Sequence, residues 1–107
     1  MLHELRIYET VPGMLPALNQ RFANVTLPLW KKYGIRPVAF WTEDVGTSNR
    51  LVYLLEWESL AEREQKFPAF QADPEWQRKR AESEKDGPLV ARIENRILRP
   101  TPYSPLR

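Results

Sequence analysis

Apolar and polar residues alternate along four stretches of this 107-residue chain. A period of two residues is typical of β-strands that bury one of their faces. The pattern predicts strands over His3–Glu9, Val38–Glu43, Arg50–Glu58 and Leu89–Leu98. The second and third strands form a β-hairpin, because only the polar, glycine-containing segment 44–49 separates them.

A helical period follows the first strand. Apolar residues three or four positions apart predict a helix over Met14–Tyr33. Pro28 cannot donate a helical hydrogen bond, so we expect a kink or an interruption near residues 24–27. Gly34 is the expected end of this helix.

Two more helices are predicted after the hairpin. Ser59 and Glu62 form a capping box, which begins a helix over residues 60–71. Pro68 is expected to make the second half of that helix irregular. A further helix, capped by Asp73 and begun by Pro74, is predicted to run to about Lys85.

The resulting order, β-α-β-β-α-β, defines a ferredoxin-like α+β domain with four antiparallel strands in one sheet and the helices on one face. We expect the helices to cover Leu5 and Ile7. The opposite face would then be too aromatic to stay bare in water, and we expect it to pack on a second copy of the chain. That arrangement is a dimeric α/β barrel with a cavity between two sheets. The candidate lining residues of this cavity are Arg6, Tyr8, Trp41, Tyr53, Trp57, Arg92 and Glu94.

Charge and composition exclude several classes of protein. Sixteen basic and 14 acidic residues give a net charge of +2, which is too balanced for a nucleic-acid partner. No apolar stretch approaches the ~20 residues of a membrane span, and the N-terminus carries no signal-peptide core, so we expect a cytoplasmic protein with no membrane partner. The length predicts one domain over residues 1–99, followed by a proline-rich tail over residues 100–107 that lies on a surface.

Metal chemistry has little support in the sequence. The chain has no Cys and a single histidine, His3, so it cannot supply the usual ligands of a zinc site. We expect His3 to be exposed or to cap the end of a strand, with axial ligation of a haem as the less favoured alternative. We therefore expect no metal and no cofactor.

Several motifs together resemble the NIPSNAP family, and the resemblance covers nearly the whole chain. The Phe-Trp-Thr hairpin combined with the Glu-Ser-Leu helix start is its most specific part. The resemblance implies a ferredoxin-like dimeric α/β barrel. It implies little about activity, because bacterial members are mostly of unknown function and the wider barrel superfamily includes cofactor-free monooxygenases, haem-degrading enzymes and isomerases. The matching segments are Glu4–Tyr8, Pro12-Gly13, Phe40–Gly46, Asn49, Leu54–Arg63, Asp73–Trp76 and Ile97–Pro100.

Two readings of the polar candidates stay open. Arg6 and Tyr8, together with Arg92 and Glu94, could form a site in which arginine holds a carboxylate and tyrosine donates to an oxyanion. The same residues could instead form salt bridges that hold two subunits in register.

The aromatic candidates are equally open. Trp41, Tyr53 and Trp57 could stack on a planar ligand, or they could pack in a subunit interface.

Three functions remain compatible with the sequence. The first is a homodimer, or a higher oligomer, that binds a small molecule in its barrel. The second is a cofactor-independent monooxygenase or isomerase that acts on a small aromatic or enolisable substrate, with Arg6 and Tyr8 stabilising an enolate. The third is a structural or interaction module without a ligand. The sequence leaves open whether the protein is an enzyme.

Overall fold

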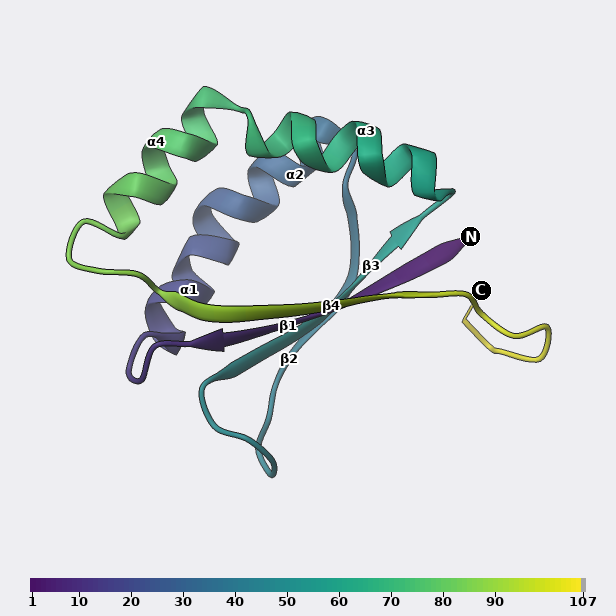
Figure 1. Cartoon of the computed structure of the whole chain (residues 1–107), viewed down its shortest axis with the longest axis horizontal. Helices are drawn as coiled ribbons and strands as arrows, with labels where there is room; N and C mark the ends of the chain where they lie inside the picture. Colours follow the sequence, from purple (N-terminus) through teal and green to yellow (C-terminus); the bar gives the residue numbers. More distant parts are fainter. Residues whose placement is uncertain (107) are drawn as a thin grey trace.

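The sheet has the predicted ferredoxin-like topology. A computed structural model describes residues 1–106, so the predicted tail lies within the described residues except for its last position. The four strands are antiparallel neighbours in the order β2-β3-β1-β4. The two strands that are adjacent in sequence form the expected hairpin, and the first and last strands meet side by side (Figure 1). The strands are β1 (Leu2–Thr10), β2 (Arg36–Thr42), β3 (Arg50–Trp57) and β4 (Val90–Leu98).

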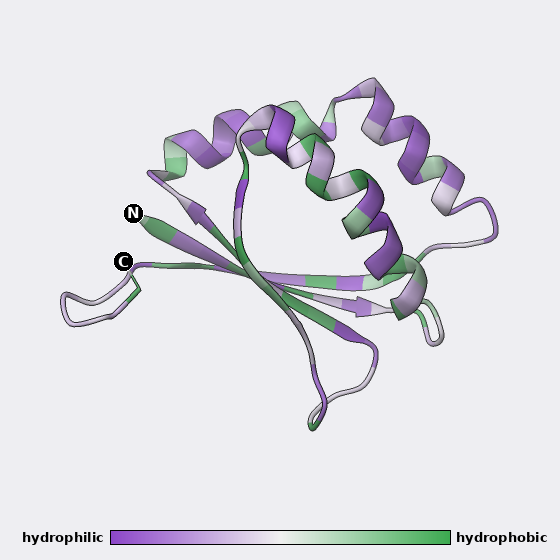
Figure 2. Cartoon of the chain, turned by 180° about the vertical axis from the view of Figure 1, so that it is seen from behind, coloured by the Kyte–Doolittle hydropathy of each residue, from purple (hydrophilic) through white to green (hydrophobic). Residues whose placement is uncertain are grey.

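The helices cover one face of this sheet (Figure 1). Their caps are the predicted ones: the Ser59 side chain accepts a hydrogen bond from the Glu62 backbone N–H, and the Asp73 side chain accepts two from the turn that follows it. Figure 2 shows that most residues of the last helix are hydrophilic, and none of them is buried. The helical segments are α1 (Leu15–Arg21), the π-helix η1 (Phe22–Thr26), α2 (Leu27–Tyr33), α3 (Leu60–Gln71) and α4 (Pro74–Ser83).

Pro28 has the predicted effect on the first helix, and the irregularity takes a specific form. The backbone stays helical, but it widens to a π-helix over η1, in which the Leu27 N–H bonds the Phe22 carbonyl five residues earlier. Pro28 has no N–H for the Asn24 carbonyl, and its ring would crowd that carbonyl in a regular α-helix. A wider turn relieves the crowding without ending the helix.

Pro68 behaves differently from the prediction. Helix α3 continues through Pro68 to Gln71, so the expected irregular second half was wrong. The helix tolerates the proline because Phe67 and Phe70, on either side of it, are both buried against the sheet side of the domain. Burial of two phenylalanines offsets the loss of one backbone hydrogen bond.

The predicted assignment of the two sheet faces was wrong for β1 and β3. Side chains of Glu4, Arg6 and Tyr8 are buried under the helices, whereas Leu5 and Ile7 lie on the opposite, open face and are only partly buried. Register places Tyr53 beside Arg6 and Trp57 beside Leu2, so both aromatic residues of β3 also face the helices. The polar side chains of β1 can be buried there because they form hydrogen bonds with one another and with α3.

His3 also departs from the prediction. It lies on the open face, pairs in register with Glu56 and Leu98, and is buried rather than exposed. Its side chain therefore points away from the helices and from the polar residues between the helices and the sheet.

Candidate functional site

A carboxylate at the centre of the domain joins the sheet to α3. Glu4 is 0% exposed and accepts hydrogen bonds from two arginines: Arg6 Nη1 at 2.8 Å, and Arg63 through Nε at 2.8 Å and Nη2 at 3.0 Å. Trp57 Nε1 and Asn95 Nδ2 complete its shell at 3.1 and 3.0 Å. Every oxygen of this buried carboxylate is thus satisfied, which is the condition under which a buried charge is tolerated.

Two tyrosines extend this network from Arg6. The guanidinium, which is 6% exposed, donates through Nε to the Tyr53 hydroxyl at 2.7 Å and through Nη2 to the Tyr8 hydroxyl at 3.2 Å. The Tyr53 hydroxyl is also 3.0 Å from that of Tyr8. The Phe67 ring lies under the guanidinium, with Arg6 Cζ 4.8 Å from the ring centroid. Arg6 is therefore fixed on four sides.

The network shifts the acidity of its members. Burial alone would raise the pKa of Glu4, but hydrogen bonds from Arg63 and Asn95 and the charge of Arg6 outweigh it and hold the pKa at about 2. Burial raises the pKa of Tyr53 well above its ordinary value, and the neighbouring Tyr8 adds to that rise against the opposing charge of Arg6. Glu4 is thus ionised and Tyr53 is neutral near pH 7.

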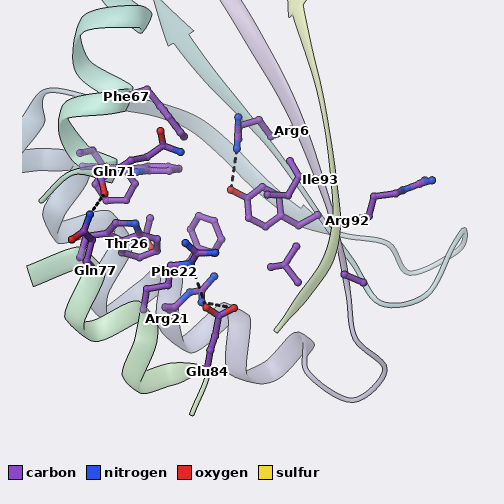
Figure 3. A pocket seen from close by; sticks show the side chains of 17 residues that line it. Arg6, Arg21, Phe22, Thr26, Phe67, Gln71, Gln77, Glu84, Arg92 and Ile93 are labelled. Carbon is purple, nitrogen blue, oxygen red and sulfur yellow. Dashed lines mark hydrogen bonds and ion pairs between the residues drawn. The ribbon is translucent and has the colours of Figure 1, made fainter. Parts of the chain in front are cut away.

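A cavity of about 440 Å³ lies beside this network, between the sheet and the helices. Arg6 and Tyr8 line it from β1, and Val90, Ala91, Arg92 and Ile93 line it from β4. In Figure 3 Arg6 points into the cavity from the sheet, while Arg21, Phe22 and Thr26 lie on the helical side. The helical lining residues are Arg21, Phe22, Thr26, Trp30, Phe67, Phe70, Gln71, Trp76, Gln77, Arg80 and Glu84.

Aromatic side chains make up much of the cavity wall. The Phe22 ring contacts Tyr8 and Trp30 in edge-to-face geometry, with both centroids 5.7 Å away. Phe70 links Trp30 to Trp76, at centroid distances of 6.1 and 4.8 Å. Such walls favour flat apolar groups, because ring faces and edges offer large contact areas at low entropic cost.

Arg21 brings a second guanidinium to the cavity from the end of α1. Its Nη1 donates to Ser83 Oγ at 3.2 Å and lies 3.9 Å from a Glu84 carboxylate oxygen, and its Cζ lies 5.4 Å from the centre of the Trp76 ring. Burial, opposed by Glu84, lowers the pKa of this guanidinium. Through its contacts with Arg21 and Phe70, Trp76 anchors α4 to the domain.

The family of this protein is identified from a match over nearly the whole sequence and not from the cavity. The sequence model of the NIPSNAP family matches residues 3–105. The chain belongs to the NIPSNAP family. A comparison with curated proteins found no match.

Solved NIPSNAP structures have the same fold as this chain. An uncharacterised NIPSNAP-like domain protein from Burkholderia xenovorans is 29% identical, with a TM-score of 0.86 over 97% of this chain and 88% of that one. The protein Atu4242 from Agrobacterium tumefaciens is 26% identical, with a TM-score of 0.87 over the full length of both chains. At 13% identity, a monooxygenase from the gene ActVA-Orf6 of Streptomyces coelicolor, in complex with nanaomycin D, gives a TM-score of 0.62 over 94% of this chain and 87% of that chain. This last likeness shows the fold alone.

The structure separates the NIPSNAP chain's predicted site residues into three groups. Arg6 and Tyr8 line the cavity, but on the helix side of the sheet instead of the face predicted for them. Tyr53 and Trp57 lie on that same side, buried behind the cavity, where they hydrogen-bond to Arg6 and Glu4. The remaining three, Trp41, Arg92 and Glu94, point from the open face, although Arg92 is also one of the β4 residues that border the cavity.

The predicted cluster of Arg6, Tyr8, Arg92 and Glu94 is therefore not formed within the chain. Register pairs Arg92 with Glu9 and Glu94 with Ile7, on the side of β4 that faces away from the helices. Figure 3 shows the Arg92 side chain turned away from the cavity. Glu94 pairs instead with Arg96, Nη2 to Oε1 at 2.9 Å.

Sequence reasoning missed the residues that make the cavity a polar site. Glu4 and Arg63 are 59 positions apart, and no local pattern pairs them. In the sequence, Arg21, Thr26 and Trp30 belong to a predicted helix, and no pattern marks them as site residues. Pro28 was the one sequence signal of this wall. It predicts an interruption of the helix, and the interruption is the π-helix that places Phe22 and Thr26 in the cavity wall.

Two features are absent from residues 1–106, a cluster of possible metal ligands and a helix that could cross a membrane. In that part of the chain no three His, Cys, Asp or Glu side chains are grouped so that they could hold a metal ion. None of the helices described there is long and apolar enough to cross a membrane.

Proposed function

We propose that this NIPSNAP protein binds a small, planar, anionic organic molecule in the cavity between its sheet and its helices. We further propose that it does so as a homodimer whose open sheet faces pack together. The first proposal moves the expected ligand site from between two sheets to the inside of one protomer.

The charge balance of the buried network carries the proposal. Inside the protein Arg6 and Arg63 share the carboxylate of Glu4, and Arg63 also pairs with the largely exposed Glu64 at 2.6 Å. Within residues 1–106 Glu4 is thus the one acidic partner of Arg6, and it divides its charge between two guanidinium groups. Arg6 is the member of this network that lines the cavity, together with the tyrosine to which it donates. A carboxylate, phenolate or enolate oxygen placed there would give Arg6 an anionic partner of its own in a site of low dielectric.

The size and walls of the cavity support a flat ligand. A volume of about 440 Å³ is within the range of pockets that enclose small organic molecules. Phe22, Trp30, Phe70 and Trp76 offer rings at the sides and base. The Streptomyces coelicolor monooxygenase of the same fold was solved with nanaomycin D, so the fold is compatible with an organic ligand.

The open face supports self-association. Its centre is aliphatic, formed by Leu5 and Ile7 of β1 and by Val52 and Leu54 of β3, which pair in register. Trp41, which is 50% exposed, adjoins Val52 from β2. An apolar patch of this kind, flanked by the charged side chains of the edge strands, is typical of an interface between copies of a chain.

A monooxygenase or isomerase is the second candidate, and one observation favours it. Tyr8 accepts from Arg6 and lies beside Tyr53, yet among the described residues nothing accepts its own proton. That hydroxyl could donate to an oxyanion that forms on a bound substrate. Oxygen uptake in the presence of a dihydroxynaphthalene, above that of heat-inactivated protein and reduced in Tyr8→Phe, would support this candidate.

Calorimetric titration with 2-naphthoate and with uncharged 2-naphthamide tests the binding proposal. We expect the carboxylate to bind about tenfold more tightly than the amide, the effect of one charge-assisted hydrogen bond. Arg6→Met should abolish the preference, whereas Arg92→Met, whose side chain points away from the cavity, should keep it. Equal binding of the two compounds by the parent protein, or no binding of either, would overturn the proposal.

A further inference from the structure

Three residues that line the cavity each carry a buried polar side-chain atom with no hydrogen-bond partner within residues 1–106. The atoms are Arg21 Nε, Thr26 Oγ1 and Trp30 Nε1. The three residues are 7%, 2% and 1% exposed, so bulk water does not satisfy them. Buried polar groups in folded proteins are almost always paired, and an unpaired one needs an explanation.

All three groups can act as hydrogen-bond donors. An indole N–H and a guanidinium N–H can only donate, and a threonine hydroxyl can also donate. Three further unpaired atoms, on His3, Thr10 and Arg50, belong to residues that do not line the cavity. The three unpaired groups of the lining residues can all donate, so an acceptor oxygen is the one kind of partner that would suit each of them.

The π-helix explains why these residues share one wall. In a regular α-helix, residues 21 and 26 would be about 140° apart around the axis. The wider turn of η1, with its bond from Leu27 N–H to the Phe22 carbonyl, brings residues five apart nearly above one another. Trp30 lies one regular turn beyond Thr26. The helix thus presents all three side chains to the same cavity, and the wide turn relieves the crowding that Pro28 would cause in a regular helix.

We propose that Arg21, Thr26 and Trp30 form a donor edge that recognises a carbonyl-type oxygen of the ligand, at a place distinct from the anion that Arg6 recognises. This inference rests on the proposed function, because both concern the same cavity, and it narrows the ligand class. The ligand is a planar anion that carries a second, uncharged acceptor oxygen, such as a ring ketone.

Matched probes and matched variants test the donor edge. Chromone-2-carboxylate and chromone-3-carboxylate have the bicyclic outline of 2-naphthoate and add a ring ketone at two different positions. We expect at least one chromone to bind the parent protein about tenfold more tightly than 2-naphthoate, as one added hydrogen bond would give. Thr26→Val and Trp30→Phe should each lower the affinity for that chromone severalfold more than the affinity for 2-naphthoate, so that the ratio falls.

The melting temperature is a second readout. A threonine hydroxyl with a structural partner would lower it when removed, whereas an unpaired hydroxyl should raise it. Thr26→Val removes an unpaired buried hydroxyl, so it should raise the melting temperature of the ligand-free protein by about 2–5 °C. Thr10→Val removes a similarly unpaired buried hydroxyl outside the cavity, and it should raise the melting temperature without changing the chromone preference.

The outcomes are distinguishable. If 2-naphthoate binds and neither chromone binds more tightly, the donor edge is wrong and the proposed function stands. If Thr26→Val lowers the melting temperature, its hydroxyl has a structural partner and the donor edge is also wrong. If no probe binds the parent protein, the proposed function and the donor edge are overturned together.

Discussion

Arg63 of α3 donates two parallel hydrogen bonds to Glu4 of β1, from Nε to Oε1 at 2.8 Å and from Nη2 to Oε2 at 3.0 Å. The bidentate geometry fixes the angle between the helix and the central part of the sheet. Because of this pairing, Arg6 shares the Glu4 carboxylate with the guanidinium of Arg63. This pair therefore connects the fold to the positive charge of the cavity.

Arg63→Leu should lower the free energy of unfolding by about 2 kcal/mol, because a buried carboxylate loses two of its donors. Arg63→Lys should recover only part of the loss, since an ammonium group cannot form the parallel pair of bonds. Urea denaturation measures both values. Arg78→Leu, an exposed position on α4, is the control, and an equal effect there would contradict the role given to Arg63.

Acid should destabilise the protein through Glu4. Its folded pKa is about 2, below the ordinary value of 4.5, so its contribution is complete above pH 4.5 and is lost as the pH falls toward 2. The contribution is roughly 3 kcal/mol. Free energies of unfolding measured at pH 6 and pH 3 should differ less in Glu4→Gln than in the parent protein. An unchanged difference would show that Glu4 is not held ionised by its arginines.

Leu54→Glu should convert the proposed dimer into a monomer that keeps its fold. Leu54 lies at the centre of the open face, where a carboxylate would face its own copy across an apolar interface. Sedimentation velocity measures the mass, and circular dichroism checks the fold. Ile97→Glu changes an exposed isoleucine on the other face of the sheet and should leave the dimer intact. A parent protein that sediments as a monomer would contradict the proposed interface.

Tyr8→Phe should weaken the binding of 2-naphthoate about fivefold to tenfold. The variant removes the hydroxyl that Arg6 and Tyr53 support, and with it one donor to the ligand anion. Tyr103→Phe, in the exposed C-terminal segment, is the control. Calorimetry gives both affinities, and equal affinities would place the ligand away from Tyr8.

The elements of this fold were predictable because their signals are local. The side chains of Ser59 and Asp73 cap their helices wherever the chain leads, and the alternation in β1 predicts a strand whichever face is buried. Which face of β1 lies under the helices was not predictable from local signals. Leu5 and Ile7 are the apolar residues of β1, yet Glu4 and Arg6 lie under the helices, because Arg63 supplies the partner that makes their burial possible.

The cavity was beyond sequence reasoning for a related reason. Pro28 predicts that the first helix is disturbed, but a proline can kink a helix, end it or widen one turn. Only the widened turn brings Arg21 and Thr26 onto one wall. The candidate residues Arg6 and Tyr8 were nonetheless found, because charged and phenolic side chains inside a strand pattern are unusual wherever they point.

A crystal structure of the protein grown with 2-naphthoate tests the central claim most directly. The account predicts electron density for the naphthalene ring between the sheet and the helices of a single protomer, against Phe22 and Trp30, with the carboxylate within hydrogen-bonding distance of Arg6 or Tyr8. Density between two sheets, beside Trp41 and Leu54, would contradict it.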